Sequence, residues 1–202
     1  MERNVICISR SLAAGGEEIA RLIADETGFR YTDDEIIVDA AQELGVSPEQ
    51  VAEVENTPGL VGRILSAIRS APLPEGYTVL PSGLPTSYKL LIEQVIRRAA
   101  DQGDAVIVAH GGSFALTDRT QVLRVLVTAP PSVRALRLVA QAGMSNEEAK
   151  RSVAESDVQR ERYLRRFYHI EHELPTHYDI VVNTEHLTPT LAARLIVSAA
   201  GG

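Results

Sequence analysis

Short apolar runs alternate with amphipathic stretches along the whole chain. The runs at residues 4–9 (NVICIS), 104–109 (DAVIVA), 122–128 (VLRVLVT) and 178–183 (YDIVVN) are rich in β-branched residues, and a shorter run covers 29–32. Continuous apolar runs of this length are typical of strands that are buried on both faces of a parallel sheet. The pattern therefore predicts five parallel strands.

Helical patterns and helix-boundary residues separate these strands. Gly28 stands where the first helix should end. Residues 145–148 (SNEE) form a capping-box pattern, and the helix that they open runs to about Tyr168. Residues 130–131 (PP) and 188–189 (TP) mark two more helix starts. Helices between parallel strands cover both faces of the sheet, so the expected fold class is α/β, a three-layer sandwich.

A proline-rich stretch at about residues 56–86 interrupts this alternation and carries one helical pattern. Such a stretch is typical of an insertion over one edge of a core. The chain has 202 residues, of which 45% are hydrophobic, and this is enough for one well-formed core. We therefore expect a single domain over residues 1–202, with this insertion and a long arginine-rich helix at about 145–168.

Charge and composition narrow the classes of partner. The net charge of −7 argues against a chain that binds nucleic acid over its whole surface, but it leaves room for a local anion site. No apolar run approaches the roughly 18 residues of a membrane span, and the N-terminal residues lack the pattern of a signal peptide. The single cysteine, Cys7, lies in an apolar run and is expected to be a small buried side chain. These features predict a cytoplasmic protein.

The turn after the first strand, residues 9–18 (SRSLAAGGEE), is the first candidate for binding chemistry. Small residues let successive N–H groups face one point at a helix N-terminus, which suits a phosphate. Against the P-loop signature GxxxxGK[ST], Arg10 falls at the first glycine, Gly15 at the second, Gly16 at the lysine and Glu17 at the Ser/Thr. The alternative is a tight strand-to-helix turn in which Glu17 and Glu18 complement the helix dipole.

Four ordered stretches follow the pattern of one known family. Members typically open with I-S-R and G-S-G-G-R-E-I-A, where this chain has ISR and AAGGEEIA within residues 8–20. A Y-D-R-E-L-I-like segment and a strand ending V-I-V-G-R-G-A-N-F correspond to YTDDEII at 31–37 and VIVAHGGSF at 106–114. The patterns A-P-x-x-x-R, S-x-E-E-A-K and D-x-x-R-x-R-Y are matched within residues 129–163. In these stretches the chain resembles the cytidylate kinase-like family of P-loop nucleoside monophosphate kinases.

The resemblance implies a P-loop kinase fold with a helical lid, and ATP-dependent phosphoryl transfer, with Mg²⁺, to a cytidylate-like nucleotide or another small phosphate acceptor. The expected partner is a small-molecule nucleotide, with no nucleic acid or membrane and with a homodimer left open. For ATP the expected residues are Arg10, Ser11, Leu12, Ala13, Ala14, Gly15, Gly16 and Glu17. For the acceptor they are Asp33, Asp34, His110 and Gly111, and for catalysis Arg134, Arg160, Arg162 and Arg166.

Departures from the family pattern support a second hypothesis. Glu17 replaces an arginine and reverses the charge beside the phosphate site, and His110 replaces an arginine that by resemblance would bind the acceptor phosphate. Ala13 in place of glycine stiffens the loop. A catalytically impaired relative, serving as a nucleotide- or anion-binding module, is therefore the alternative. If the loop keeps P-loop geometry, Gly16→Lys should tighten ATP binding.

Plainer structural roles compete at several of these positions. The arginines of the long helix could form a solvated face paired with nearby acids, and Arg134 could form a surface salt bridge. Asp33 could be a helix N-cap. The spacing of His169, His172 and His177 matches no common zinc site, so no metal site held by protein side chains alone is expected.

Overall fold

The computed structural model describes residues 3–33, 93, 96–109 and 111–201. Five strands form one fully parallel sheet in the order β2-β3-β1-β4-β5. The predicted five-stranded parallel sheet is thereby confirmed. The strands are β1 (Val5–Arg10), β2 (Arg30–Thr32), β3 (Ala105–Val108), β4 (Val122–Thr128) and β5 (Ile180–Asn183).

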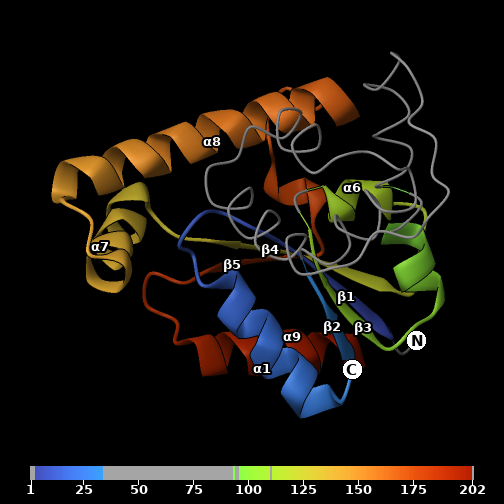
Figure 1. Cartoon of the computed structure of the whole chain (residues 1–202). Helices are drawn as coiled ribbons and strands as arrows, with labels where there is room; N and C mark the ends of the chain where they lie inside the picture. Colours follow the sequence, from blue (N-terminus) through green and yellow to red (C-terminus); the bar gives the residue numbers. More distant parts are fainter. Residues whose placement is uncertain (1–2, 34–92, 94–95, 110, 202) are drawn as a thin grey trace, which may run out of the picture.

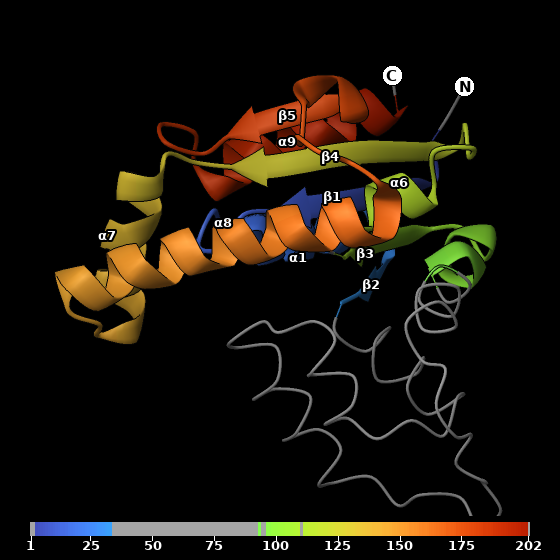
Figure 2. The same cartoon turned by 90° about the horizontal axis from the view of Figure 1, so that it is seen from above.

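Helices lie on both faces of the sheet, as the alternating pattern predicts (Figures 1 and 2). Helices α1 and α9 cover one face, α6 and α8 lie on the other, and α7 stands beyond the carboxyl end of β4. Residues 96–101 are also helical. The bounds are α1 (Gly16–Thr27), α6 (Gly112–Ala115), α7 (Pro131–Ala142), α8 (Asn146–Tyr168), the 3₁₀ helix η1 (Pro175–His177) and α9 (Pro189–Gly201).

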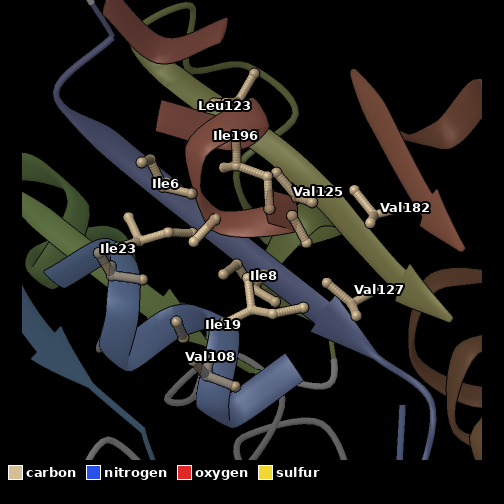
Figure 3. Close-up of a cluster of buried hydrophobic side chains, with 14 of the residues drawn as sticks. Ile6, Ile8, Ile19, Ile23, Val108, Leu123, Val125, Val127, Val182 and Ile196 are labelled. Carbon is tan, nitrogen blue, oxygen red and sulfur yellow. The ribbon is translucent and has the colours of Figure 1, made fainter. Parts of the chain in front are cut away.

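The main hydrophobic core lies between the sheet and helices α1 and α9 (Figure 3). Ile6 and Ile8 of the central strand pack there against Ile19 and Ile23 of α1 and Ile196 of α9. Each of these five isoleucines is fully buried. Because β1 is covered on both faces, all six of its residues are buried, which explains its continuous apolar sequence.

Alternation along β1 decides which side chains face which helical layer. Ile6 and Ile8 face α1, so Arg10 at the end of the strand projects toward the same side. Cys7 faces α6, where a Cβ atom on Gly112 would lie 2.6 Å from its Sγ atom. The expectation of a small buried side chain is confirmed, and burial raises the pKa of Cys7 to about 12, which disfavours the reactive thiolate.

The helix boundaries follow the sequence signals closely. Helix α1 ends before Gly28, whose backbone adopts the left-handed conformation that favours glycine. At the start of α8, the Ser145 side chain accepts from the Glu148 N–H at 3.3 Å, and the Glu148 carboxylate accepts from the Ser145 N–H at 2.9 Å. This reciprocal pair is the predicted capping box.

Several sequence predictions lie outside the described residues: the insertion at 56–86, Asp34 with the helix expected after it, and His110. Within the described part of the chain, no helix is long and apolar enough to cross a membrane.

Candidate active site

The turn between β1 and α1, residues 11–15, curls at the carboxyl edge of the sheet. Four of its carbonyl groups accept hydrogen bonds, two from backbone N–H groups and two from side chains. Those of Ser11 and Gly15 accept from the N–H groups of Ala14 and Ile19 at 3.1 and 3.0 Å. Those of Ala13 and Ala14 accept from side chains, Arg137 at 3.3 Å and Thr184 at 2.7 Å.

Most amide N–H groups of this turn, unlike its carbonyls, have no hydrogen-bond partner among the described residues. In the described structure no acceptor is found for the N–H groups of Leu12, Ala13, Gly15 or Gly16. Ala13 and Gly15 both have positive φ angles, a left-handed geometry that turns neighbouring amides toward one side. Free amides at the N-terminus of α1, together with engaged carbonyls, are an arrangement suited to binding an anion. We call residues 11–16 the phosphate loop.

The side chain of Arg10 fills the space that a side chain at position 16 would need. A Cβ atom built on Gly16 would lie 2.6 Å from Cβ and 3.0 Å from Cγ of Arg10. The P-loop signature has glycine at the position of Arg10 and lysine at the position of Gly16. In this chain the bulky cation comes from the strand and the glycine from the helix. The geometry therefore gives no support to the expectation that a lysine added at position 16 simply improves the loop.

The guanidinium of Arg10 lies between two carboxylates. Its Nε donates to Oε1 of Glu17 at 2.6 Å, and its Nη2 lies 3.9 Å from Oδ1 of Asp33. The reversed charge at Glu17 is therefore balanced by Arg10. The side chain of Asp33 is 10% exposed, and Tyr31 donates to its Oδ2 at 2.6 Å. Its Oδ1 is buried and has no hydrogen-bond donor among the described residues, so a buried carboxylate oxygen remains available beside Arg10.

Arg160 of α8 is buried and fully engaged. It donates to both oxygens of Glu173, at 2.7 and 2.5 Å, and to the Tyr178 hydroxyl at 3.3 Å. Its Nη1 donates to the carbonyl of Arg10 at 3.3 Å. Burial opposes the charged form of Arg160, but Glu173 outweighs this effect and raises the pKa of Arg160. Arg160 thus docks α8 on the end of β1.

Arg134 of α7 is also buried and paired. Its Nε donates to the carbonyl of Ala129 at 2.9 Å, and its two terminal nitrogens bind the carboxylate of Asp157 on α8 at 2.9 and 2.6 Å. A bidentate pair of this kind fixes the angle between two elements. Only 3% of Arg134 is exposed, whereas the side chain of Asp157 is 38% exposed, so the salt bridge considered from the sequence is present but is buried on the arginine side.

Arg162 and Arg166 are both exposed, on the side of α8 away from Arg160. Residues two positions apart in a helix differ by roughly 200° in direction. Arg162 therefore points nearly opposite to Arg160. Arg162 has no ion-pair partner among the described residues, and the guanidinium of Arg166 lies 5.3 Å from the ring centroid of Phe167. The four arginines expected in catalysis are therefore not brought together. Two brace the fold and two remain at the surface.

The position of Gly111 leaves no room for a side chain, because the ring of Tyr168, the last residue of α8, packs against it. A Cβ atom on Gly111 would lie 2.5 Å from the ring of Tyr168, so the ring rests on the glycine backbone. Gly111 precedes α6, which contributes Phe114 to the same aromatic group, with its ring centroid 5.4 Å from that of Tyr168. The structure thus shows a packing role for Gly111. No cluster of three or more metal-ligating side chains occurs in the residues that the structure describes.

Two residues of the site were not among the predicted site residues: Arg137, for which a surface salt bridge was considered together with Arg134, and Thr184. Both bind carbonyl groups of the phosphate loop. Thr184 directly follows β5, at the edge where ligands bind in open parallel sheets, and this position was a signal that could have identified it. Arg137 stands three residues after Arg134, so spacing alone could not separate its role from that of its neighbour.

The sequence and the fold agree with those of known kinases. Residues 5–186 match the cytidylate kinase-like family. The chain is 26% identical over 194 residues to a cytidylate kinase from Ignicoccus hospitalis, and the match covers 95% of this chain and 96% of that protein.

Solved structures extend the likeness to the fold alone. An uncharacterized protein from Eubacterium ventriosum superposes with a TM-score of 0.67 at 14% identity, covering 97% of each chain. A shikimate kinase from Bacteroides thetaiotaomicron has a TM-score of 0.52 at 11% identity, covering 96% of this chain and 94% of its own. The parallel sheet with its phosphate loop is therefore that of a P-loop kinase. Since the family match extends over most of the chain, this protein belongs to the cytidylate kinase-like family.

Proposed function

We propose that this protein transfers a phosphoryl group from ATP to a nucleotide or another small phosphate acceptor. The observation that carries the proposal is the phosphate loop, in which four amides have no acceptor among the described residues while the carbonyls are engaged. Such a loop can bind phosphate through its backbone amides, and the charge that a lysine would supply must then come from another residue. A cytidylate-like nucleotide is the first acceptor to test, because a relative over nearly the whole chain is described as a cytidylate kinase.

Arg10 is the cation that this site offers in place of the lysine. It lies under Gly16, between the phosphate loop and Asp33. An arginine can bind phosphate oxygens through two nitrogens, and Nη1 of Arg10 has no hydrogen-bond acceptor in the described structure. In this role, Glu17 holds the guanidinium in place from the side of α1.

The residues present also suit Mg²⁺. Asp33 offers a buried carboxylate oxygen without a hydrogen-bond donor among the described residues, and Mg²⁺ prefers oxygen ligands of this kind together with substrate phosphates and water. When bound, the ion would neutralise charge on the donor phosphates. Asp33 would then orient it from the side of β2, while the loop amides hold the phosphates.

A second function is favoured by one specific observation. The guanidinium of Arg10 is engaged by Glu17 at 2.6 Å, so part of its charge is already balanced inside the protein. A loop with a balanced cation can bind an anion through its amides and still lack the positive charge that transfer needs. The protein would then serve as a nucleotide- or anion-binding module of the same fold.

Ligand binding and turnover separate these two functions. For the kinase, ATP with Mg²⁺ at about 100 times its Kd should raise the melting temperature by about 5–10 °C, because a ligand that binds only the folded state stabilises it. Cytidylate should then be phosphorylated in the same mixture. A shift without phosphate transfer to any nucleoside monophosphate would favour the binding module. No shift with any nucleotide at millimolar concentration would refute both.

Arg162 offers a test of the role of α8. Because its side chain is exposed and unpaired in the described structure, Arg162→Ala should leave the free energy of unfolding within about 0.5 kcal/mol of the wild type. If Arg162 closes over the phosphates, kcat should fall by about 100-fold. The matched control is Arg165→Ala, which removes an exposed arginine paired with Glu171 on the same helix and should leave kcat unchanged. Equal losses of activity and stability for Arg162→Ala would contradict the catalytic role.

A further inference from the structure

Two side chains from distant parts of the chain hold the phosphate loop from behind. Arg137 comes from the middle of α7, and Thr184 follows β5. Each donates to one loop carbonyl, Arg137 to that of Ala13 and Thr184 to that of Ala14. No other described side chain donates to the carbonyl of either alanine.

These contacts form a chain with a defined direction. Nη1 of Arg137 donates to the Thr184 hydroxyl at 2.9 Å, and Nη2 donates to the Thr184 carbonyl at 2.5 Å. A hydroxyl has one hydrogen, and here it is directed to the carbonyl of Ala14 at 2.7 Å. Thr184 is 3% exposed, and its N–H donates to the carbonyl of Thr128 at 2.8 Å. The loop is thus tied to the ends of both β4 and β5.

The loop needs this support because of its backbone conformation. Ala13 has a positive φ angle, a left-handed conformation that alanine adopts only at an energetic cost. Turning the carbonyls of Ala13 and Ala14 outward is what leaves the amides free to face an anion. Strained conformations of this kind persist only where surrounding contacts hold them.

We infer that Arg137 and Thr184 are positioning residues that set the phosphate affinity of the loop by holding the carbonyls of Ala13 and Ala14, without themselves touching the phosphate. This inference rests on the proposed phosphate-binding function. The guanidinium of Arg137 is half-buried and donates to three oxygens, the carbonyl of Ala13 and the hydroxyl and carbonyl of Thr184. Its two terminal nitrogens are therefore engaged with the protein. Thr184 is neutral, so its contribution cannot be a direct charge effect.

Thr184 therefore provides the sharper test. Thr184→Val keeps the shape and charge of the side chain and removes the hydroxyl, whereas Thr184→Ser keeps the hydroxyl. With tripolyphosphate as the probe and calorimetry as the measurement, we expect Thr184→Val to raise the Kd by about tenfold, comparable to the loss of one net hydrogen bond. Thr184→Ser should bind within about twofold of the wild type.

Arg137 should act through the same contacts. Arg137→Ala should weaken tripolyphosphate binding about as much as Thr184→Val, and the double variant should be little worse than either, since residues in one network are not additive. Ile196→Val provides the stability control, because it lowers stability in the main core without removing a hydrogen bond to the loop. Its Kd should equal that of the wild type at a temperature where all variants are folded.

The outcomes separate this inference from the proposed function. If the wild type binds tripolyphosphate and Thr184→Val binds it equally well, the positioning role is refuted while phosphate binding stands. If only Arg137→Ala loses affinity and its effect adds fully to that of Thr184→Val, Arg137 contacts the phosphate directly, and the inference is wrong. If the wild type binds neither tripolyphosphate nor ATP, the proposed function fails, and this inference fails with it.

Discussion

Replacing Arg160 with alanine is expected to destabilise the protein by about 3–5 kcal/mol, because it leaves the carboxylate of Glu173 largely buried without its partner. Arg160 supplies two hydrogen bonds to Glu173 and one to the carbonyl of Arg10, so its loss also frees α8 from the end of β1. Chemical denaturation would measure the change. The exposed pair of Arg165 and Glu171 is the control, and Arg165→Ala should cost less than about 1 kcal/mol.

The same pair gives stability a defined dependence on pH. Burial alone would raise the pKa of Glu173, but the hydrogen bonds and charge of Arg160 outweigh it and hold the pKa below its ordinary value. The contribution is therefore fully present above the unfolded-state pKa of about 4.3 and is lost as the pH falls through the folded-state value. Wild-type stability should fall in that acid range, and Glu173→Gln should make the fall shallower. A stability loss below about 1 kcal/mol for Arg160→Ala would contradict the structural role and restore a purely catalytic one.

Introducing the signature lysine at position 16 is expected to lower both the stability of the protein and its affinity for ATP. The Cβ atom of Gly16→Lys would lie 2.6 Å from Cβ of Arg10, which is close to the backbone and cannot swing aside. Overpacking of this kind costs about 1–3 kcal/mol, and ATP binding should weaken because the loop is displaced. Denaturation and calorimetry would measure both effects. Gly201→Ala is the control, since a Cβ atom there meets nothing within 4 Å.

A compensating change makes this prediction specific. Arg10→Gly combined with Gly16→Lys restores the glycine–lysine order of the P-loop signature and removes the clash. We expect the double variant to recover most of the stability that Gly16→Lys loses, a coupling of about 1 kcal/mol or more between contacting residues. Purely additive effects would show that the two positions do not share space, contrary to the structure.

Most of the fold could be predicted from local patterns. The five apolar runs became the five strands, and the capping box at Ser145 and the glycine at position 28 became helix boundaries. These signals depend on neighbouring residues and on backbone geometry, so they are visible in a sequence. The strand order was not predicted, because it depends on which apolar faces pack together in three dimensions. The cytoplasmic location, the homodimer and the insertion at 56–86 remain predictions.

The candidate site was predicted less completely. The position of the phosphate loop followed from the turn after β1, but the partners of its arginines did not. Arg134 and Arg160 look like their exposed neighbours in the sequence, and only the fold shows that Asp157 and Glu173 are brought to them. Spacing on a helix identifies a shared face, but it does not tell which face is buried when charges lie all round it.

The steric conflict between Arg10 and any side chain at position 16 limits the order in which substitutions in this loop can arise. A lysine that arises first at position 16 meets the side chain of Arg10, and a glycine that arises first at position 10 removes the arginine proposed to bind phosphate. Each single change therefore gives an intermediate that is either overpacked at position 16 or without the arginine at position 10. If Arg10 supplies the cation as proposed, the glycine at position 16 and the arginine at position 10 are an alternative to the glycine–lysine order of the P-loop signature.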